Sequence, residues 1–232
     1  MKNRFGVVIA AGGTGSRFGT DIPKQYVEIK DVPVIAHTLQ KFNDATSVSE
    51  IVIVTHKDYL VFCNDVVKAF DFCKVTSIIE GGSTRQESVY KGLKCIKSEY
   101  VLIHDAARPL VSVEDIENCC RELLNSDSCA LGAKVVDTLK FSEDGTYISS
   151  TVDRSRLWSI QTPQCFKTDA ILKCHRNAVF ENFIATDDCM LAEKYGLKIK
   201  LIEAKSNNFK ITNYKDLAVA EVLLDAKSRD GL

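Results

Sequence analysis

Short apolar runs alternate with longer amphipathic segments through the first half of the chain. Four runs rich in Val and Ile are typical of buried parallel strands: Phe5–Ala10, Ile51–Thr55, Val75–Ile79 and Tyr100–His104. The segments that follow them carry apolar residues at helical spacing: Val34–Phe42, Tyr59–Phe70, Gln86–Ile96 and Val113–Leu124. Strands separated by helices of this length form βαβ units, so the pattern predicts an α/β fold with a mostly parallel sheet.

The pattern changes after Val135. Residues 137–153 have no helical period and contain two β-like runs around Glu143-Asp144-Gly145, which indicates a hairpin. We expect residues 137–158 to form an inserted β-arm that projects from the body. Further along, the pattern predicts helices and one strand: Asp169–Phe180, Asp187–Tyr195 and Asn213–Ala226 as helices, Lys198–Ile202 as the strand. We find no repeat or linker in the sequence, so residues 1–232 are predicted to form a single domain with an arm.

The composition excludes several classes of protein. The 232 residues include 30 Lys and Arg against 31 Asp and Glu, and 45% of them are hydrophobic. This mixture is typical of a globular chain, and its balanced charge argues against a bulk nucleic-acid binder. No apolar run approaches the roughly 20 residues that a membrane span needs. The first run, which ends at Ala11, is too short for a secretion signal, so we expect a cytoplasmic protein.

The chain has nine cysteines, and none of them forms a C-x-x-C pair. A zinc site would need paired spacings, and a disulfide scaffold would need an even number in a shorter chain. We interpret the cysteines as buried free thiols in a reducing cytoplasm.

The loop after the first predicted strand reads Ala10-Ala11-Gly12-Gly13-Thr14-Gly15-Ser16-Arg17. Glycines there let the backbone approach a ligand, and successive N–H groups can hold phosphate oxygens. Arg17 and Lys24 add two cations next to this loop, as phosphoryl and nucleotidyl transfer require. The alternative is a simple tight turn with solvated charges, because the loop matches neither Walker A nor G-x-G-x-x-G.

Two more loops follow predicted strands. Gly81-Gly82-Ser83-Thr84-Arg85 opens a helix, which suits an anionic ligand, although Ser83 or Thr84 could simply be an N-cap. His104-Asp105-Ala106-Ala107-Arg108 ends the fourth strand, where open parallel sheets bind ligands. Asp105 could hold a divalent cation that bridges triphosphate oxygens, or could form an ion pair with Arg108.

All three loops follow strands of one parallel sheet, so we expect them to meet at one edge. Together they would form a basic, glycine-lined pocket with one carboxylate. A nucleoside triphosphate and its metal ion require such a pocket.

With these motifs in this order, the chain resembles the bacterial 2-C-methyl-D-erythritol 4-phosphate cytidylyltransferases, the IspD-type enzymes of isoprenoid precursor synthesis. The resemblance runs nearly end to end and rests on A-G-G-T-G-S-R-F-G, P-K-Q-Y, G-G-S-T-R-Q-E-S-V, H-D-A-A-R-P, D-T-L-K, T-V-D-R-S-R-L-W, Q-T-P-Q-C-F, T-D-D and F-K-I-T. It implies a Rossmann-like nucleotidyltransferase fold, a homodimer built partly through the hairpin arm, CTP as co-substrate and Mg²⁺.

The resemblance also implies roles for individual residues. Arg17 and Lys24 would be the principal catalytic cations. The remaining roles divide by ligand: Ala11, Gly12, Gly13 and Gly15 would wrap the triphosphate; Gly82, Arg85, Ser88 and Ala106 would lie at the nucleotide; Asp105, also the metal ligand, and Lys210 would lie beside the phosphates; Thr138, Arg154 and Thr186 would hold the sugar phosphate. Arg154 would reach in from the partner subunit.

Two alternatives stay open. The Gly12-Gly13 form of the first loop is similar to the ribitol 5-phosphate cytidylyltransferases of wall and capsule synthesis, and Lys134 and Phe209 stand where Pro and Ile are usual. D-A-A-R-P, D-T-L-K and T-V-D-R-S-R-L-W favour the erythritol enzymes. A nucleotide-binding module without turnover is the other alternative, but such a sensor would not need both Arg17 and Lys24.

Overall fold

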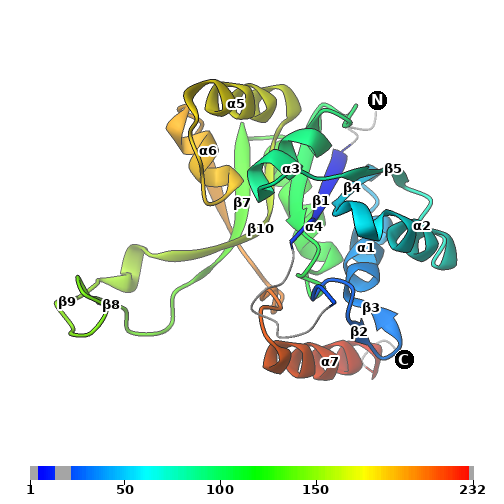
Figure 1. Ribbon diagram of the computed structural model, residues 1–232. Coiled ribbons are helices and arrows are strands. Elements are labelled where there is room, and N and C mark those ends of the chain that lie inside the picture. The colour runs from blue at the N-terminus through cyan, green and yellow to red at the C-terminus, as the bar shows by residue number, and fades with distance from the viewer. Residues whose placement is uncertain (1–4, 14–21, 230–232) are drawn as a thin grey trace.

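The computed structural model describes residues 5–13 and 22–229 (Figure 1). Its strands are β1 (Phe5–Ala11), β2 (Glu28–Ile29), β3 (Val32–Pro33), β4 (Val48–Thr55), β5 (Val75–Glu80), β6 (Tyr100–Asp105), β7 (Ser128–Lys134), β8 (Lys140–Phe141), β9 (Ser150–Thr151), β10 (Trp158–Lys167) and β11 (Ile199–Glu203). Its α-helices are α1 (Val34–Asp44), α2 (Leu60–Ala69), α3 (Arg85–Leu93), α4 (Val113–Leu123), α5 (Thr168–Glu181), α6 (Asp188–Lys194) and α7 (Tyr214–Arg229). Short 3₁₀ turns lie at Lys57–Tyr59 and Arg154–Arg156.

Seven strands form the central sheet in the order β11-β7-β10-β6-β1-β4-β5. The pairs β1–β4, β1–β6, β4–β5 and β7–β11 are parallel, and only β10 runs antiparallel to its neighbours β6 and β7. The α/β class and the mostly parallel sheet predicted from the sequence are therefore confirmed.

Helices cover both faces of this sheet, as the alternation of buried strand residues requires. On one face, Ile9 and Ile53 pack with residues of α1, α2 and α4 in one apolar cluster. On the other face, Val8 and Val54 pack with residues of α3, α5 and α6. Helix α7 closes the end of the domain over the β2–β3 hairpin, where Leu217 and Ala220 join a smaller cluster.

Helix α3 lies unusually close to the sheet at Gly92. A Cβ atom built there would come within 2.7 Å of both Val8 Cγ1 and Val54 Cγ2, which no side chain tolerates. The glycine therefore allows the helix to pack directly on β1 and β4, at a cost in helix propensity of about 1 kcal/mol relative to alanine.

The sequence pattern did not predict β7 or β10. Strand β7 reads SCALGAK, in which small residues replace the Val and Ile of the other strands, and β10 reads WSIQTPQCFK, with polar residues and a proline. The proline lies where the pairing with β7 shifts register, between Ile160 and Gln164, so it removes no regular ladder bond. These two strands form because their neighbours supply the pairing.

The segment expected to form an arm lies apart from the body in Figure 1, with β8 and β9 paired antiparallel near its tip. The central sheet resumes at Trp158, the last residue of the expected insertion.

All nine cysteines are free, and seven of them are buried. Cys73 is exposed and Cys95 only partly buried, so the expectation of uniformly buried thiols is wrong at these two positions. Among the residues that the structure describes, we find no helix with the length and apolar character of a membrane span.

Candidate active site

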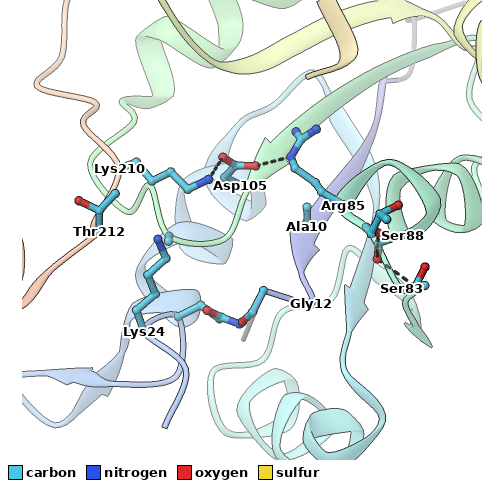
Figure 2. Close-up of a pocket in the computed structure, with 14 residues that line it drawn as sticks. Ala10, Gly12, Lys24, Ser83, Arg85, Ser88, Asp105, Lys210 and Thr212 are labelled. Carbon is cyan, nitrogen blue, oxygen red and sulfur yellow. Dashed lines mark hydrogen bonds and ion pairs between the residues drawn. The ribbon is translucent and has the colours of Figure 1, made fainter. Parts of the chain in front are cut away.

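A pocket of about 360 Å³ opens where β1, β5 and β6 end, and all three glycine- or aspartate-bearing loops contribute to it (Figure 2). Its lining includes Gly12 and Gly13 from the first loop, Gly82, Arg85 and Ser88 from the second, and Asp105 from the third. Lys24, Lys210 and Thr212 complete it from other segments. The convergence expected from strand order is therefore present in the fold.

The first loop leaves β1 with Ala11 buried and Gly13 exposed. The Gln25 side-chain amide donates to the carbonyl oxygens of Ala11 at 2.7 Å and of Gly13 at 2.8 Å. The Tyr26 hydroxyl donates to the same Ala11 carbonyl at 2.8 Å. Arg17 and Gly15, which the sequence analysis assigned to the triphosphate, lie outside the described residues.

The second loop leads into α3, whose N-cap is Thr84. The Thr84 hydroxyl accepts a hydrogen bond from the Glu87 N–H at 3.1 Å, and Glu87 accepts one from the Ser83 N–H at 2.8 Å. Ser88 Oγ accepts from the Gly82 N–H at 3.0 Å and donates to the Thr84 carbonyl at 2.8 Å. The N-cap expected as the simpler alternative is thus real, and it shapes the loop that lines the pocket.

Asp105 lies between two cations, as Figure 2 shows. Its Oδ1 accepts from Arg85 Nε at 3.0 Å and its Oδ2 from Lys210 Nζ at 2.7 Å, while Arg108 Nε lies 4.0 Å from Oδ2. Burial alone would raise the pKa of Asp105, but the charges of Arg85 and Lys210 outweigh it and hold that pKa well below its ordinary value. The carboxylate is therefore ionised throughout the neutral range.

Arg85 is held from a second side by α6. Its Nη1 donates to Asp188 Oδ2 at 2.7 Å, and the other oxygen of Asp188 lies 3.2 Å from His175 Nε2 in α5. Burial opposes the ionised form of Asp188, yet the Arg85 charge and the His175 hydrogen bond lower its pKa. Two carboxylates thus fix the direction of one guanidinium in the pocket wall.

His104 has a structural role in this fold. It is fully buried, its Nε2 contacts the Arg108 carbonyl at 3.2 Å, and its Nδ1 contacts Thr162 Oγ1 at 3.0 Å. Burial lowers its pKa to about 3. Ala106 is buried too: its N–H donates to the Ala10 carbonyl at 3.1 Å, and its carbonyl accepts from Thr38 at 2.8 Å.

Three expected substrate residues lie away from this pocket lining. Thr138 and Arg154 are exposed on the arm, where the Arg154 guanidinium donates to the carbonyl of Val136. Thr186 is exposed in the turn before α6, where its hydroxyl contacts Met190 Sδ at 3.5 Å. The fold of a single chain brings none of the three together with Lys24.

Asp105 is the one acidic side chain in the lining of the pocket among residues 5–13 and 22–229. Over the same residues, no group of three or more His, Cys, Asp and Glu side chains is arranged to hold a metal ion. A carboxylate has about four lone-pair positions, and Arg85 and Lys210 occupy one each. The donor set therefore suits a Mg²⁺ ion shared with substrate phosphates, which commonly needs only one or two carboxylates.

Sequence reasoning missed Gln25, Asp188 and Thr212. Gln25 stands inside the P-K-Q-Y motif and Asp188 ends the T-D-D motif, so their positions were visible while their contacts were not. Thr212 lies two residues after Lys210, in the segment that leads into α7.

Chemically, the arrangement can bind a polyanion. Lys24, Arg85 and Lys210 provide three cations, and the glycine loops allow backbone approach.

Comparison with known proteins agrees with this geometry. The family model described as "IspD: 2-C-methyl-D-erythritol 4-phosphate cytidylyltransferase" matches residues 5–226. A protein of that description from Clostridium novyi (strain NT) is 44% identical over 227 residues, covering 97% of this chain and 98% of its own. The crystal structure of the 4-diphosphocytidyl-2C-methyl-D-erythritol synthase of Anaerococcus prevotii DSM 20548 superposes with a TM-score of 0.84 at 28% identity, covering 97% and 96% of the two chains. That of the 2-C-methyl-D-erythritol 4-phosphate cytidylyltransferase of Thermus thermophilus gives 0.77 at 28% identity, covering 94% and 98%.

Proposed function

Because the chain belongs to the 2-C-methyl-D-erythritol 4-phosphate cytidylyltransferase family, we propose that this pocket transfers the cytidylyl group of CTP to 2-C-methyl-D-erythritol 4-phosphate. The reaction is a step of isoprenoid precursor synthesis and yields the CDP-alditol and pyrophosphate. The observation that carries the proposal is the meeting of three loops with Lys24, Arg85 and Lys210 around one carboxylate.

The chemistry needs charge neutralisation more than proton transfer. The acceptor phosphate is already an anion near neutral pH, because its second pKa is about 6. One of its oxygens forms a bond to the α-phosphorus of CTP, and the bond from that phosphorus to the bridging oxygen of the β-phosphate breaks, so pyrophosphate leaves with the electron pair. Lys24, together with Arg17, stabilises the negative charge that accumulates on these oxygens.

The nucleotide end of the pocket is assigned to the second loop. Gly82, Arg85 and Ser88 contact the cytidine, and the glycines of the first loop wrap the triphosphate. This assignment is supported by the pocket, whose lining includes Gly82, Arg85 and Ser88.

Mg²⁺ is proposed as the metal, with Asp105 as its protein ligand and Lys210 beside the same phosphates. When bound, the ion neutralises charge on the triphosphate oxygens. Asp105 is suited to the role because its low pKa keeps the carboxylate ionised.

The acceptor site is proposed to be completed by a second copy of the chain. Thr138 and Arg154 lie on the exposed arm, and the arm also exposes apolar side chains: Val136 is 80% exposed, Tyr147 76% and Ile148 67%. Apolar groups on a projecting hairpin favour a partner surface. Thr186, in the turn before α6, would hold the phosphate of the acceptor.

The free cysteines suit the reducing environment of the cytoplasm.

The test is pyrophosphate release from CTP and Mg²⁺ in the presence of 2-C-methyl-D-erythritol 4-phosphate, with ribitol 5-phosphate as the control acceptor. We expect release with the erythritol substrate and little with the ribitol. Release with ribitol 5-phosphate alone would overturn the acceptor assignment, and no release with either would leave nucleotide binding without turnover.

A further inference from the structure

Gln25 forms hydrogen bonds to the first loop that have no role in the reaction described above. Its side-chain amide has two N–H groups, and each donates to a different loop carbonyl, Ala11 at 2.7 Å and Gly13 at 2.8 Å. The residue is only 3% exposed. Both donors are therefore committed to the loop backbone, 12 and 14 residues away in sequence.

The direction of these two carbonyls matters for a phosphate cradle. A loop binds phosphate through N–H groups that point at the anion, and a carbonyl oxygen turned toward the same anion repels it. With Ala11 and Gly13 carbonyls bonded to Gln25, the peptide groups around Gly12 cannot rotate freely. Gly12 itself could otherwise do so easily, because glycine populates most of the backbone map.

Gln25 is itself held rigidly. Its own carbonyl accepts from the Ile35 N–H at 2.9 Å, at the start of α1. The next residue, Tyr26, donates to Ala11 as well and stacks on Tyr59 with ring centroids 4.1 Å apart. The preceding residue is Lys24, which lines the pocket. One short segment thus fixes a cation and the glycine loop relative to each other.

We propose that Gln25 is a positioning residue that holds the Ala11 and Gly13 carbonyls away from the triphosphate and sets the distance between the glycine loop and Lys24. The proposal rests on the proposed function, because it concerns the triphosphate end of the same pocket. It predicts that Gln25 acts on phosphate binding and leaves recognition of the cytidine unchanged.

The experiment compares the affinities of CTP and CMP for Gln25→Met, a side chain of similar length without a donor, by calorimetric titration of the full chain. We expect the CTP affinity to fall about tenfold, equal to about 1.4 kcal/mol, and the CMP affinity to change less than about threefold. Gln25→Glu, whose carboxylate would face two carbonyls, should lose more. Gln40→Met on α1, where the amide donates only to Asp44, is the matched control and should lose nothing.

Equal losses for CTP and CMP would indicate a general structural role and overturn the proposal, as would unchanged CTP affinity. Should Gln25→Met fail to fold, Tyr26→Phe removes one of the two donors from Ala11 and should show a smaller loss confined to CTP; no loss there would also overturn it. If the unaltered protein bound no CTP, the proposed function itself would fail. If the unaltered protein and Gln25→Met bound CTP equally well, only the role of Gln25 would fail.

Discussion

Lys24 lies in the pocket wall on the side of the first loop, while Lys210 and Arg85 share the carboxylate of Asp105. Since pyrophosphate leaves with a negative charge that the ground state does not carry at the same oxygens, Lys24 is expected to act mainly in the transition state.

Replacing Lys24 with alanine should lower kcat by roughly 100-fold or more and change the KM for CTP only a few-fold. Steady-state pyrophosphate release at varied CTP measures both. Lys68→Ala, on the exposed side of α2, is the control for loss of a surface charge. A rise in KM with kcat unchanged would mean that Lys24 only binds the nucleotide.

The charged residues of the pocket could be identified from the sequence. The residues that orient them or the neighbouring backbone could not. Lys24 and Asp105 stand next to recognisable turns, so their motif placed them. Asp188 contacts Arg85 across 103 residues of sequence, and Gln25 acts on backbone atoms that any residue could supply. Contacts of these two kinds depend on the tertiary fold and leave no local pattern.

At the scale of elements, the runs of Val and Ile predicted β1, β4, β5 and β6, and apolar residues at helical spacing predicted the helices between them. Neither pattern predicted β7 or β10. In those two strands, burial comes from neighbouring strands and from α4 and α5, so small and polar residues suffice. The arm was predicted from its hairpin signal, but two strands of two residues each have little stability alone.

If Arg154 reaches the acceptor site of a partner chain, two inactive variants should complement each other. Co-expressed in equal amounts, Lys24→Ala and Arg154→Ala chains would form mixed dimers in half of all pairings, each with one intact site. We expect about a quarter of the unaltered activity. Activity no higher than that of the separate variants would mean that Arg154 acts within its own chain or not at all.

Across the whole molecule, ion pairs and hydrogen bonds between ionisable groups connect strand β6, helices α3, α5 and α6, and the segment before α7. Asp105 and Asp188 have lowered pKa values, and His104 has its pKa lowered from 6.5 to about 3. The unfolded chain therefore binds more protons than the folded one below pH 6.5, first at histidine and then, below about pH 4, at the carboxyl groups. The stability that these groups contribute is complete above pH 6.5 and is lost as the pH falls.

Urea unfolding from pH 7.5 to pH 3 should accordingly show a free energy of unfolding that falls through this range. Asp188→Asn should be less stable at pH 7 by about 3 kcal/mol, because Arg85 keeps one buried partner instead of two. It should also depend less steeply on pH below about 4, since one titrating carboxyl group is gone. Parallel curves for the two proteins would show that Asp188 does not contribute to the acid transition.

The contact at Gly92 ties the geometry of catalysis to a residue that touches no ligand. Helix α3 packs on β1 and β4 there, about two turns beyond Arg85. The distance between the first turn of the helix and the sheet therefore depends on the absence of a side chain at Gly92. A single methyl group at position 92 would lift the helix and carry the Arg85 guanidinium and the Ser88 hydroxyl outward together. If Arg85 and Ser88 contact the cytidine as proposed, selectivity for the pyrimidine is therefore sensitive to steric crowding in the interior of the domain.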